Sequence, residues 1–517
     1  MSTSPSTSGS PAAAGSDKLD RGLMLVASVV VLGAVMSILD VTVVNVAINT
    51  LSQEFDSPLS TIQWVATGYT LALATVIPIT GWAADRFGTK RLYIISIGLF
   101  MGGSALAGAA WSAESLIFFR ILQGLGGGMI MPAGMTILTR TAGPQRVGRV
   151  MAIIGVPMLL GPILGPILGG YLVDSVSWRW IFYINVPIGI VALVMAFRIL
   201  PTDRPEPRHR FDALGLAMLS PGLALLIYGL AETSSAGGFG ATKVLVPALA
   251  GAALLAAFVW HALRTEEPLI DLRLFKNRTF AAASGTLILF VIAVFGSMLL
   301  LPLYLQAVRG ESALMSGLLL APQGFGAMLV MPIAGQLTDK TGIAKIVLVG
   351  TTLIMLGTLG LTQITADTSY WTLSGILFVF GMGMGGAMMP IMSGAMQTLR
   401  KAAVAKASTS LNIIQQVGAS IGTAVMSVLL ITALSDRLPQ SGEGGGLGAT
   451  QVPDAVRERI APLMADAFAS TFWWALALLA ISFLSAFLLP FRKPEPVHDP
   501  EDDAEAEGTG APVLVHV

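Results

Sequence analysis

The chain has 517 residues, of which 54% are hydrophobic and only 12% are charged, and its mean hydropathy is +0.76. This composition is far too apolar for a soluble protein, so it predicts an integral membrane protein. The formal net charge of +0 gives no electrostatic case for a nucleic-acid partner, and the absence of cysteine excludes disulfides and cysteine-ligated metals. We expect no metal, no cofactor and no enzymatic activity, because no nucleophile, metal-ligand cluster or ATP-binding phosphate loop is present.

Residues 1–22 are rich in Ser, Pro, Ala and Gly and predict a disordered tail, whereas residues 492–517 predict an acidic, solvated tail. Between them lie fourteen apolar segments of about 20 residues, the length that a bilayer requires of a helix. The chain is therefore predicted to be all-α, with fourteen transmembrane helices. The expected segments are 23–48, 62–84, 92–111, 115–138, 147–173, 180–200, 212–231, 244–263, 279–305, 314–338, 345–364, 371–396, 408–434 and 470–490.

Lys and Arg are distributed unequally between alternate loops. When the N-terminus is placed in the cytoplasm, 23 of the 30 Lys and Arg residues fall on the cytoplasmic side and 6 on the outer side. Cytoplasmic loops carry the excess of cations in membrane proteins. Both termini are therefore predicted to be cytoplasmic, in a multi-pass protein of the inner or plasma membrane.

Three motifs recur at nearly the same offset along the chain. The pairs are GWAADRFGTKR (81–91) with GQLTDKTGIAK (335–345), GGMIMP (127–132) with GGAMMP (385–390), and Gly161 and Gly165 with Gly418 and Gly422. The repeat predicts two related six-helix halves, residues 23–200 and 279–491, joined by residues 201–278, which carry two inserted helices. Two halves around a midplane site are typical of an alternating-access carrier.

Several ordered motifs resemble one known family. GWAADRFGTKRL resembles the loop signature of the major facilitator superfamily, RILQGLGGG (120–128) its fourth-helix signature, and GVPMLLGPILGPILGG (155–170) its antiporter-associated fifth helix. LDVTVVNVAI (39–48), WRWIFYINVPIG (178–189) and the two inserted helices resemble the fourteen-span drug:proton antiporters. The resemblance implies a proton-coupled exporter of lipophilic or cationic drug-like compounds, without a cofactor and driven by the proton gradient.

Asp40 is a carboxylate inside the otherwise apolar first segment. At 1.5 Å per residue it lies roughly 25 Å from the start of the helix, and Arg120 is expected at a comparable depth on the fourth segment. The two are candidates to pair, and if the pair opens during transport, desolvation favours a protonated carboxyl. Three roles stay open for Asp40: a proton or cation site formed with Arg120, a static structural pair, or a water-facing residue near the outer mouth.

The repeated loop and the Gly/Pro helix are candidate gating elements. Family resemblance implies that Asp85 latches the cytoplasmic side by accepting hydrogen bonds from the amides at a helix N-terminus in the other half. The alternatives are that the loop cations only set topology and that the glycines only allow tight packing. The candidate gating residues are Gly81, Asp85, Arg86, Gly88, Lys90, Arg91, Gly161, Pro162, Gly165, Pro166 and Asp339.

The sequence identifies the substrate far less well than it identifies the transport mechanism. Candidate cavity residues are Asn45, Tyr69, Gln123, Met131, Phe295, Gln306, Gln323, Phe325, Asn412 and Gln415. Their polar and soft apolar side chains suit varied molecules, although most Met and Phe residues are expected to serve packing. The expected partners are a small-molecule substrate, protons and the lipid bilayer, with a monomer as the functional unit. The alternatives are an exporter dedicated to one metabolite or lipid and, more remotely, a transport-inactive receptor or assembly factor.

Two regions are expected to be connecting structure. The inserted helices contain no charge in mid-span and are interpreted as a linker packed against the bundle. In the long outer loop 435–470, residues 452–468 are predicted to form a short amphipathic helix on the membrane surface.

Overall fold

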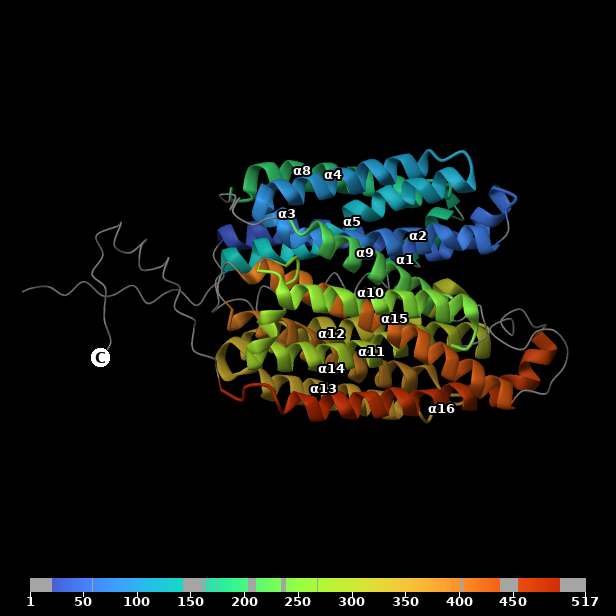
Figure 1. The fold of residues 1–517 in the computed structure, drawn as a ribbon. Coiled ribbons are helices and arrows are strands. Elements are labelled where there is room, and N and C mark those ends of the chain that lie inside the picture. The colour runs from blue at the N-terminus through green and yellow to red at the C-terminus, as the bar shows by residue number, and fades with distance from the viewer. Residues whose placement is uncertain are drawn as a thin grey trace, which may run out of the picture.

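The computed structural model describes residues 21–492 except 58, 143–160, 162–163, 166, 174, 203–210, 234–238, 267, 400–402 and 438–453. Within these ranges every regular element is a helix, and the long helices run side by side along one axis (Figure 1). The elements are α1 (Arg21–Glu54), α2 (Leu59–Val76), α3 (Ile79–Phe87), α4 (Thr89–Gly108), α5 (Ala113–Ala142), α7 (Trp180–Tyr183), α8 (Asn185–Ile199), α9 (Ala213–Ala231), α10 (Thr242–Arg264), η1 (Leu272–Lys276), α11 (Arg278–Leu303), η2 (Tyr304–Val308), α12 (Ala313–Thr341), α13 (Ile343–Leu361), α14 (Tyr370–Gln397), α15 (Val404–Arg437) and α16 (Asp454–Ala486).

The number of spans agrees with the sequence as far as the described residues extend. Twelve helices there are long and apolar enough to cross a membrane, and α2 and α3, bent by 56° to each other, make a thirteenth if they form one span. Pro78 stands at the start of α3, where its missing N–H and rigid ring interrupt the helical hydrogen bonds. The predicted segment 147–173 lies largely outside the described residues, so fourteen helices stay a prediction.

The predicted surface helix at 452–468 is wrong as a separate element. It is continuous with the last span, since α16 runs unbroken from Asp454 to Ala486. Arg437 at the end of α15 pairs with Asp466 of α16, with Nε and Oδ2 2.6 Å apart. This ion pair holds the polar first part of α16 against α15. An amphipathic pattern in the sequence does not show such a partner.

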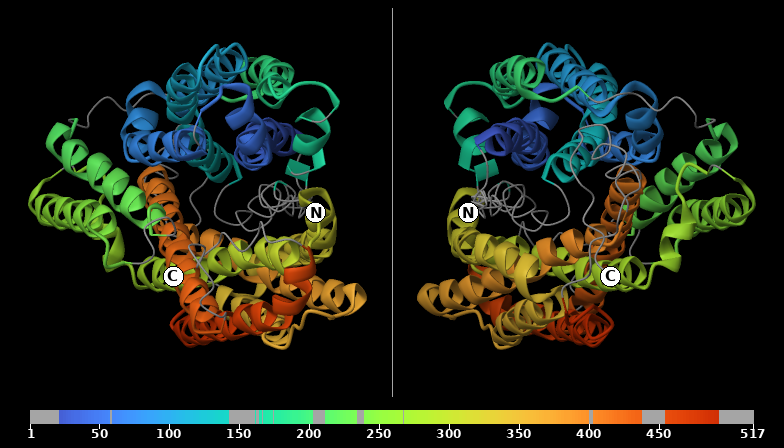
Figure 2. Two further views of the ribbon diagram at one scale, coloured as in Figure 1. Left: turned by 90° about the vertical axis from the view of Figure 1, so that its right-hand side faces the viewer. Right: turned by 90° about the vertical axis from the view of Figure 1, so that its left-hand side faces the viewer.

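The helices form two groups with a pair of helices at one side. Viewed along the bundle axis, α1–α8 lie in the upper group, α11–α16 lie in the lower group, and α9 and α10 lie at one edge (Figure 2). The described chain starts and ends at the same end of the bundle, on the left of Figure 1, which we call the termini end.

The two repeated loops share one backbone geometry at the termini end. Gly88 separates α3 from α4 with φ 86°, and Gly342 separates α12 from α13 with φ 104°. A Cβ at Gly342 would also lie 2.9 Å from the carbonyl oxygen of Phe491. Because only glycine adopts positive φ without strain, the loop of each group depends on its glycine.

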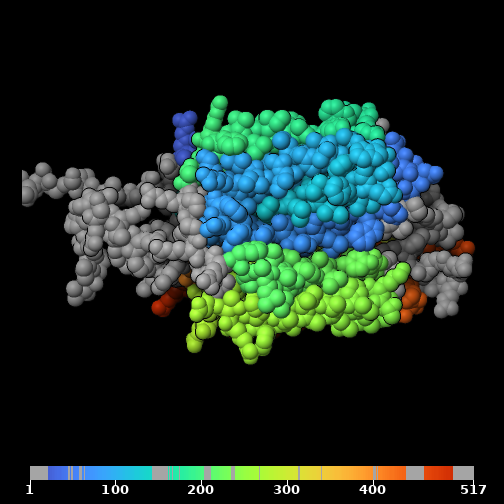
Figure 3. All heavy atoms as spheres, turned by 45° about the horizontal axis from the view of Figure 1, so that its top comes forward, coloured from blue at the N-terminus to red at the C-terminus, as the bar shows by residue number. Residues whose placement is uncertain are grey.

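Of the two inserted helices, α9 packs against both groups, and α10 packs on α9. α9 contacts α2 and α15, and the Ser220 hydroxyl donates to the carbonyl oxygen of Thr75 on α2 at 2.5 Å. In the space-filling view the surface of α9 is continuous with that of the N-terminal helices (Figure 3). The pair therefore bridges the two groups along one side of the bundle.

Candidate functional site

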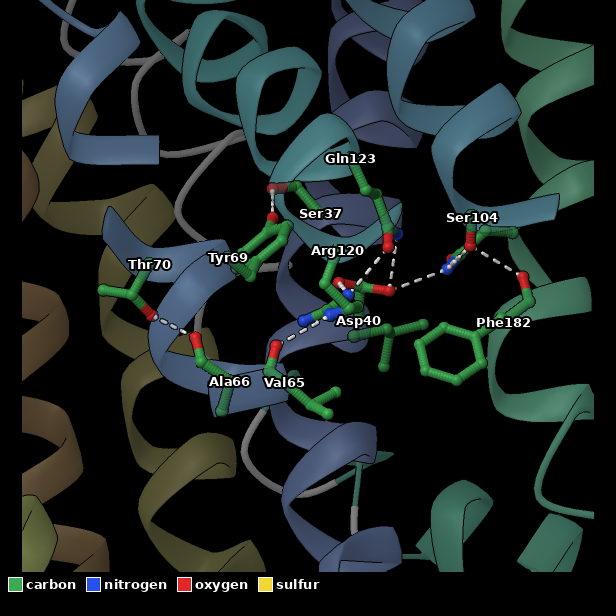
Figure 4. Close-up of polar contacts among 12 residues, drawn as sticks. Ser37, Asp40, Val65, Ala66, Tyr69, Thr70, Ser104, Arg120, Gln123 and Phe182 are labelled. Carbon is green, nitrogen blue, oxygen red and sulfur yellow. Dashed lines mark hydrogen bonds and ion pairs between the residues drawn. The ribbon is translucent and has the colours of Figure 1, made fainter. Parts of the chain in front are cut away.

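Asp40 and Arg120 form a buried ion pair. Arg120 Nη1 donates to Asp40 Oδ2 at 2.5 Å, and both side chains are fully shielded from solvent. Asp40 comes from α1 and Arg120 from α5, so the pair connects two helices of the N-terminal group (Figure 4). Burying two charges is costly unless they are paired and fully hydrogen-bonded. The stability of the pair therefore depends on the other donors and acceptors around it.

Two amides complete the surroundings of the carboxylate. Gln123 Nε2 donates to Asp40 Oδ1 at 2.8 Å, and Asn185 Nδ2 donates to the same oxygen at 3.1 Å. Asn185 also donates to the Ser104 hydroxyl, which in turn donates to the carbonyl oxygen of Phe182 at 2.9 Å. The carboxylate is thus held by α5 and α8 together, through neutral donors as well as through the cation.

Arg120 has partners that do not depend on Asp40. Its Nε donates to the carbonyl oxygen of Val65 at 3.1 Å, and its Nη1 donates to Gln123 Oε1 at 2.8 Å. Its Cζ lies 4.2 Å from the centre of the Tyr69 ring, a cation–π distance. The other terminal nitrogen, Nη2, is buried without a hydrogen-bond partner among the described residues.

The glycines that follow Arg120 bring α5 close to α2. A Cβ at Gly124 would lie 2.6 Å from the carbonyl oxygen of Tyr69, and a Cβ at Gly127 would lie 2.6 Å from the Tyr69 hydroxyl. These positions tolerate no side chain without displacement of α2. The RILQGLGGG motif therefore places the Tyr69 ring beneath the guanidinium.

A cavity of about 300 Å³ lies between the two groups of helices. Its lining comes from α1, α2, α5, α11, α12, α14 and α15, so both groups contribute. Ser37 lines it, and the Ser37 hydroxyl lies 3.4 Å from the Tyr69 hydroxyl. Ser37 thus connects the cavity to Tyr69, whose ring lies against the Arg120 guanidinium.

Asp40 does not face the cavity in this conformation. Asp40 is only 1% exposed and does not line the cavity. On α1 the cavity is lined by Ser37, Ile38, Val41 and Thr42, whereas Asp40 points toward α5 and α8. Its ion pair and the two amides account for this orientation.

The other candidate cavity residues divide into three sets. Met131, Phe295, Asn412 and Gln415 line the cavity. Tyr69 and Gln123 belong to the ion-pair site instead, and Gln323 is buried behind the lining residue Met384, to whose sulfur it donates at 3.7 Å. Gln306 and Phe325 are exposed and do not line the cavity, so placing them there was wrong; the side chain of Asn45 lies outside what the structure describes.

Residues on both sides of the turn at Gly88 make contacts that the sequence did not indicate. Asp85 pairs with Arg140 of its own group, with Oδ1 and Nη2 3.2 Å apart, while α3 packs against α15 of the other group. Lys90 Nζ donates to the carbonyl oxygens of Phe197 and Leu200 at 3.0 and 2.7 Å, and so caps the end of α8. Lys90 therefore stabilises a helix end in addition to any effect on topology.

The remaining gating candidates are placed only in part. Gly81 is buried in α3, and Arg86 and Arg91 are exposed beside it. Pro162, Pro166 and the side chain of Asp339 lie outside what the structure describes. The latch between Asp85 and a helix N-terminus stays a prediction.

Gly161 and Gly165 pack directly on α1. A Cβ at Gly161 would lie 2.1 Å from Ile38 Cγ2, and one at Gly165 would lie 2.1 Å from Thr42 Oγ1. Ile38 and Thr42 both line the cavity. The glycines thus set how closely this helix approaches the cavity-lining face of α1.

Gly165→Val is expected to lower the midpoint of thermal unfolding, since overpacking typically costs about 1–3 kcal/mol and here displaces a cavity-lining turn. Gly170→Val on the same helix is the matched control, because a Cβ there meets nothing within 4 Å. Thermal unfolding of both variants in detergent measures the effect. Equal midpoints for the two variants would show that the close approach at Gly165 does not stabilise the packing on α1.

Hydrogen bonds join the two groups on one side of the cavity. In the described part of the chain, Ser408 Oγ donates to the carbonyl oxygen of Pro132 at 3.2 Å, and Thr139 Oγ1 donates to Met396 Sδ at 3.6 Å. Both contacts involve the part of α5 that runs from the cavity-lining residue Pro132 to the termini end. They connect the two groups of helices at that end.

Sequence reasoning missed Asn185, Ser104, Gln416 and Arg140. Of these, only Asn185 lies in a recognisable motif, WRWIFYINVPIG, which resembles the fourteen-span drug:proton antiporters. Ser104 and Arg140 carry no local pattern that distinguishes them. Gln416 follows Gln415 and lines the same cavity.

Comparison with known proteins gives consistent matches along the chain. The Major Facilitator Superfamily model matches residues 30–423. The chain is 47% identical over 492 residues to the "Multidrug resistance protein B homolog" of Mycobacterium tuberculosis, covering 92% of this chain and 91% of that protein. It is 32% identical over 410 residues to the "Multidrug export protein EmrB" of Haemophilus influenzae, covering 79% and 80%.

A solved structure supports the same architecture. The proton:xylose symporter XylE superimposes with a TM-score of 0.59 at 13% identity, covering 89% of this chain and 94% of that one. At this identity the likeness concerns the fold alone.

Proposed function

Because this chain belongs to the major facilitator superfamily, and is thus a multi-pass membrane transporter rather than an enzyme, we propose that it is a proton-coupled exporter. It exchanges inward-moving protons for lipophilic or cationic drug-like compounds by alternating access. Relatives described as multidrug resistance and multidrug export proteins support the substrate class. The proposal also places the chain in the fourteen-span subfamily, with both termini in the cytoplasm and a monomer as the functional unit.

The observation that carries the proposal is the buried pair of Asp40 and Arg120 beside a cavity between the two groups. An ionisable residue inside a membrane span is by default a functional group, because burial is too costly to maintain without a role. In this proposal Asp40 is the carboxyl that carries the proton, and Arg120 is its partner in the ion pair.

The contacts of Arg120 explain how the pair can open. When Asp40 takes up a proton, the guanidinium cannot give one up and must keep other partners. Val65, Gln123 and the Tyr69 ring already provide them. Protonation of Asp40 would therefore leave a guanidinium that keeps these three partners.

The transport cycle is linked to the contacts between the groups. If the termini end is cytoplasmic, the hydrogen bonds from Ser408 and Thr139 close the cytoplasmic side, and this conformation releases substrate outward. Opening at that end requires these contacts to break. Asp85 and Arg140 lie in the same region and would be rearranged with them.

Transport into everted membrane vesicles tests the function. We expect a fluorescent lipophilic dye to accumulate when respiration acidifies the vesicle interior, and to leave again when nigericin and valinomycin in potassium buffer collapse both the pH gradient and the membrane potential. Vesicles without the protein are the control. Accumulation that survives both ionophores together would contradict proton coupling, and a competition panel would separate many substrates from a single chemical series.

A further inference from the structure

The cavity wall is mostly soft and apolar. Methionine sulfur and one aromatic ring cover much of it, including Met131, Met331, Met384 and Phe295. Methionine side chains adapt to differently shaped apolar surfaces and place no directional demand on a ligand. Specificity in such a cavity must come from the few polar groups on its wall.

Two uncharged amides on α15 are available to a ligand. Gln415 and Gln416 are both partly buried in the cavity wall, and their side chains make no hydrogen bond with any described residue. Asn412, one turn earlier, differs, because its Nδ2 donates to the carbonyl oxygen of Ser408 at 2.8 Å and to Met135 Sδ at 3.6 Å. A primary amide both donates and accepts, so it suits hydroxyl, carbonyl and amide groups.

The wall provides no countercharge for a cation. None of the described lining residues is ionisable. Asp40 is turned away and neutralised by Arg120, and Ser37 and Tyr69 lie beside that pair on the cavity side. A permanently charged ligand would lose its hydration here without gaining an anion.

We propose that this cavity binds uncharged apolar molecules that carry at least one hydroxyl, carbonyl or amide group, which hydrogen-bonds to Gln415 and Gln416. The inference rests on the proposed exporter function and narrows its substrate class, because permanent cations are excluded from tight binding. A cavity of about 300 Å³ suits a ligand of two to four fused rings.

Acridone and N-methylacridinium test the proposal, since they share a three-ring skeleton but only the second is a permanent cation. Their binding to the full-length protein in lipid nanodiscs is measured by equilibrium dialysis against empty nanodiscs. Acridone is expected to bind at least about tenfold more tightly. The double substitution Gln415→Leu with Gln416→Leu is expected to raise the Kd of acridone about fivefold or more, since two hydrogen bonds are lost.

Two further variants sharpen the test. Gln415→Glu places an anion in the wall and is expected to strengthen binding of N-methylacridinium. Gln363→Leu is the matched control, because Gln363 is exposed and outside the cavity, and should leave both Kd values unchanged.

Equal or tighter binding of N-methylacridinium by the wild type would overturn the proposal, as would an unchanged acridone Kd in the double variant, or folded protein that binds neither dye. These outcomes are independent of proton coupling. Binding as expected, combined with vesicle transport that ignores the pH gradient, would reject the proposed mechanism and leave the cavity assignment standing.

Discussion

Asp40→Asn is expected to abolish uphill export while leaving substrate binding nearly unchanged. The asparagine oxygen still accepts from Gln123 and Asn185, so the substitution imitates the protonated carboxyl with little change of shape. Asp40 does not line the cavity, so the binding surface is retained. Without a titrating group, however, the proton gradient has no means to drive the cycle.

Vesicle transport separates these two effects. The variant should equilibrate a dye down its concentration gradient yet fail to accumulate it when the vesicle interior is acidified. Asp56→Asn serves as the control, because Asp56 is an exposed carboxylate just beyond α1. Accumulation at the wild-type level by Asp40→Asn would assign coupling to another group.

Arg120→Met is expected to destabilise the protein and to stop coupled transport. Removing one partner of a buried ion pair costs about 3 kcal/mol or more, because the other charge loses its compensation. Asp40 then lacks the cation with which its carboxylate pairs, so the carboxyl can no longer alternate between a paired and an unpaired state. A lower midpoint of thermal unfolding in detergent, together with loss of accumulation in vesicles, measures both effects.

The double variant Asp40→Asn with Arg120→Met provides the matched comparison. It replaces the pair by two neutral side chains, so it should unfold at a higher temperature than Arg120→Met alone. The two substitutions are therefore expected to be non-additive in stability. Additive losses would show that Arg120 acts mainly through Val65 and Tyr69 and not through the carboxylate.

The sequence made Asp40 and Arg120 candidates to pair, because their depth in the membrane can be counted along the chain. Both lie in single apolar spans, and residue counts along two helices place them at one level of the bilayer. The orientation of Asp40 could not be predicted. It depends on Asn185 and Gln123, and Asn185 is brought to Asp40 from 145 residues away by the packing of α8.

The turns at the two repeated glycines could also be recognised from local sequence. Gly88 and Gly342 occupy matching loop positions, and a glycine between two apolar spans indicates a tight turn whatever surrounds it. Gln306 and Phe325 were placed in the cavity on residue type and span alone. The side of a helix that faces the cavity is set by helix rotation, which an apolar sequence without a clear polar face does not determine.

The most direct test of the account is substrate-induced proton release from purified protein in weakly buffered solution, comparing the wild type with Asp40→Asn across pH 6 to 9. The wild type is expected to release about one proton per bound substrate and the variant none, at similar substrate affinity. Equal release from both proteins would contradict the claim that Asp40 is the carboxyl that couples protons to export.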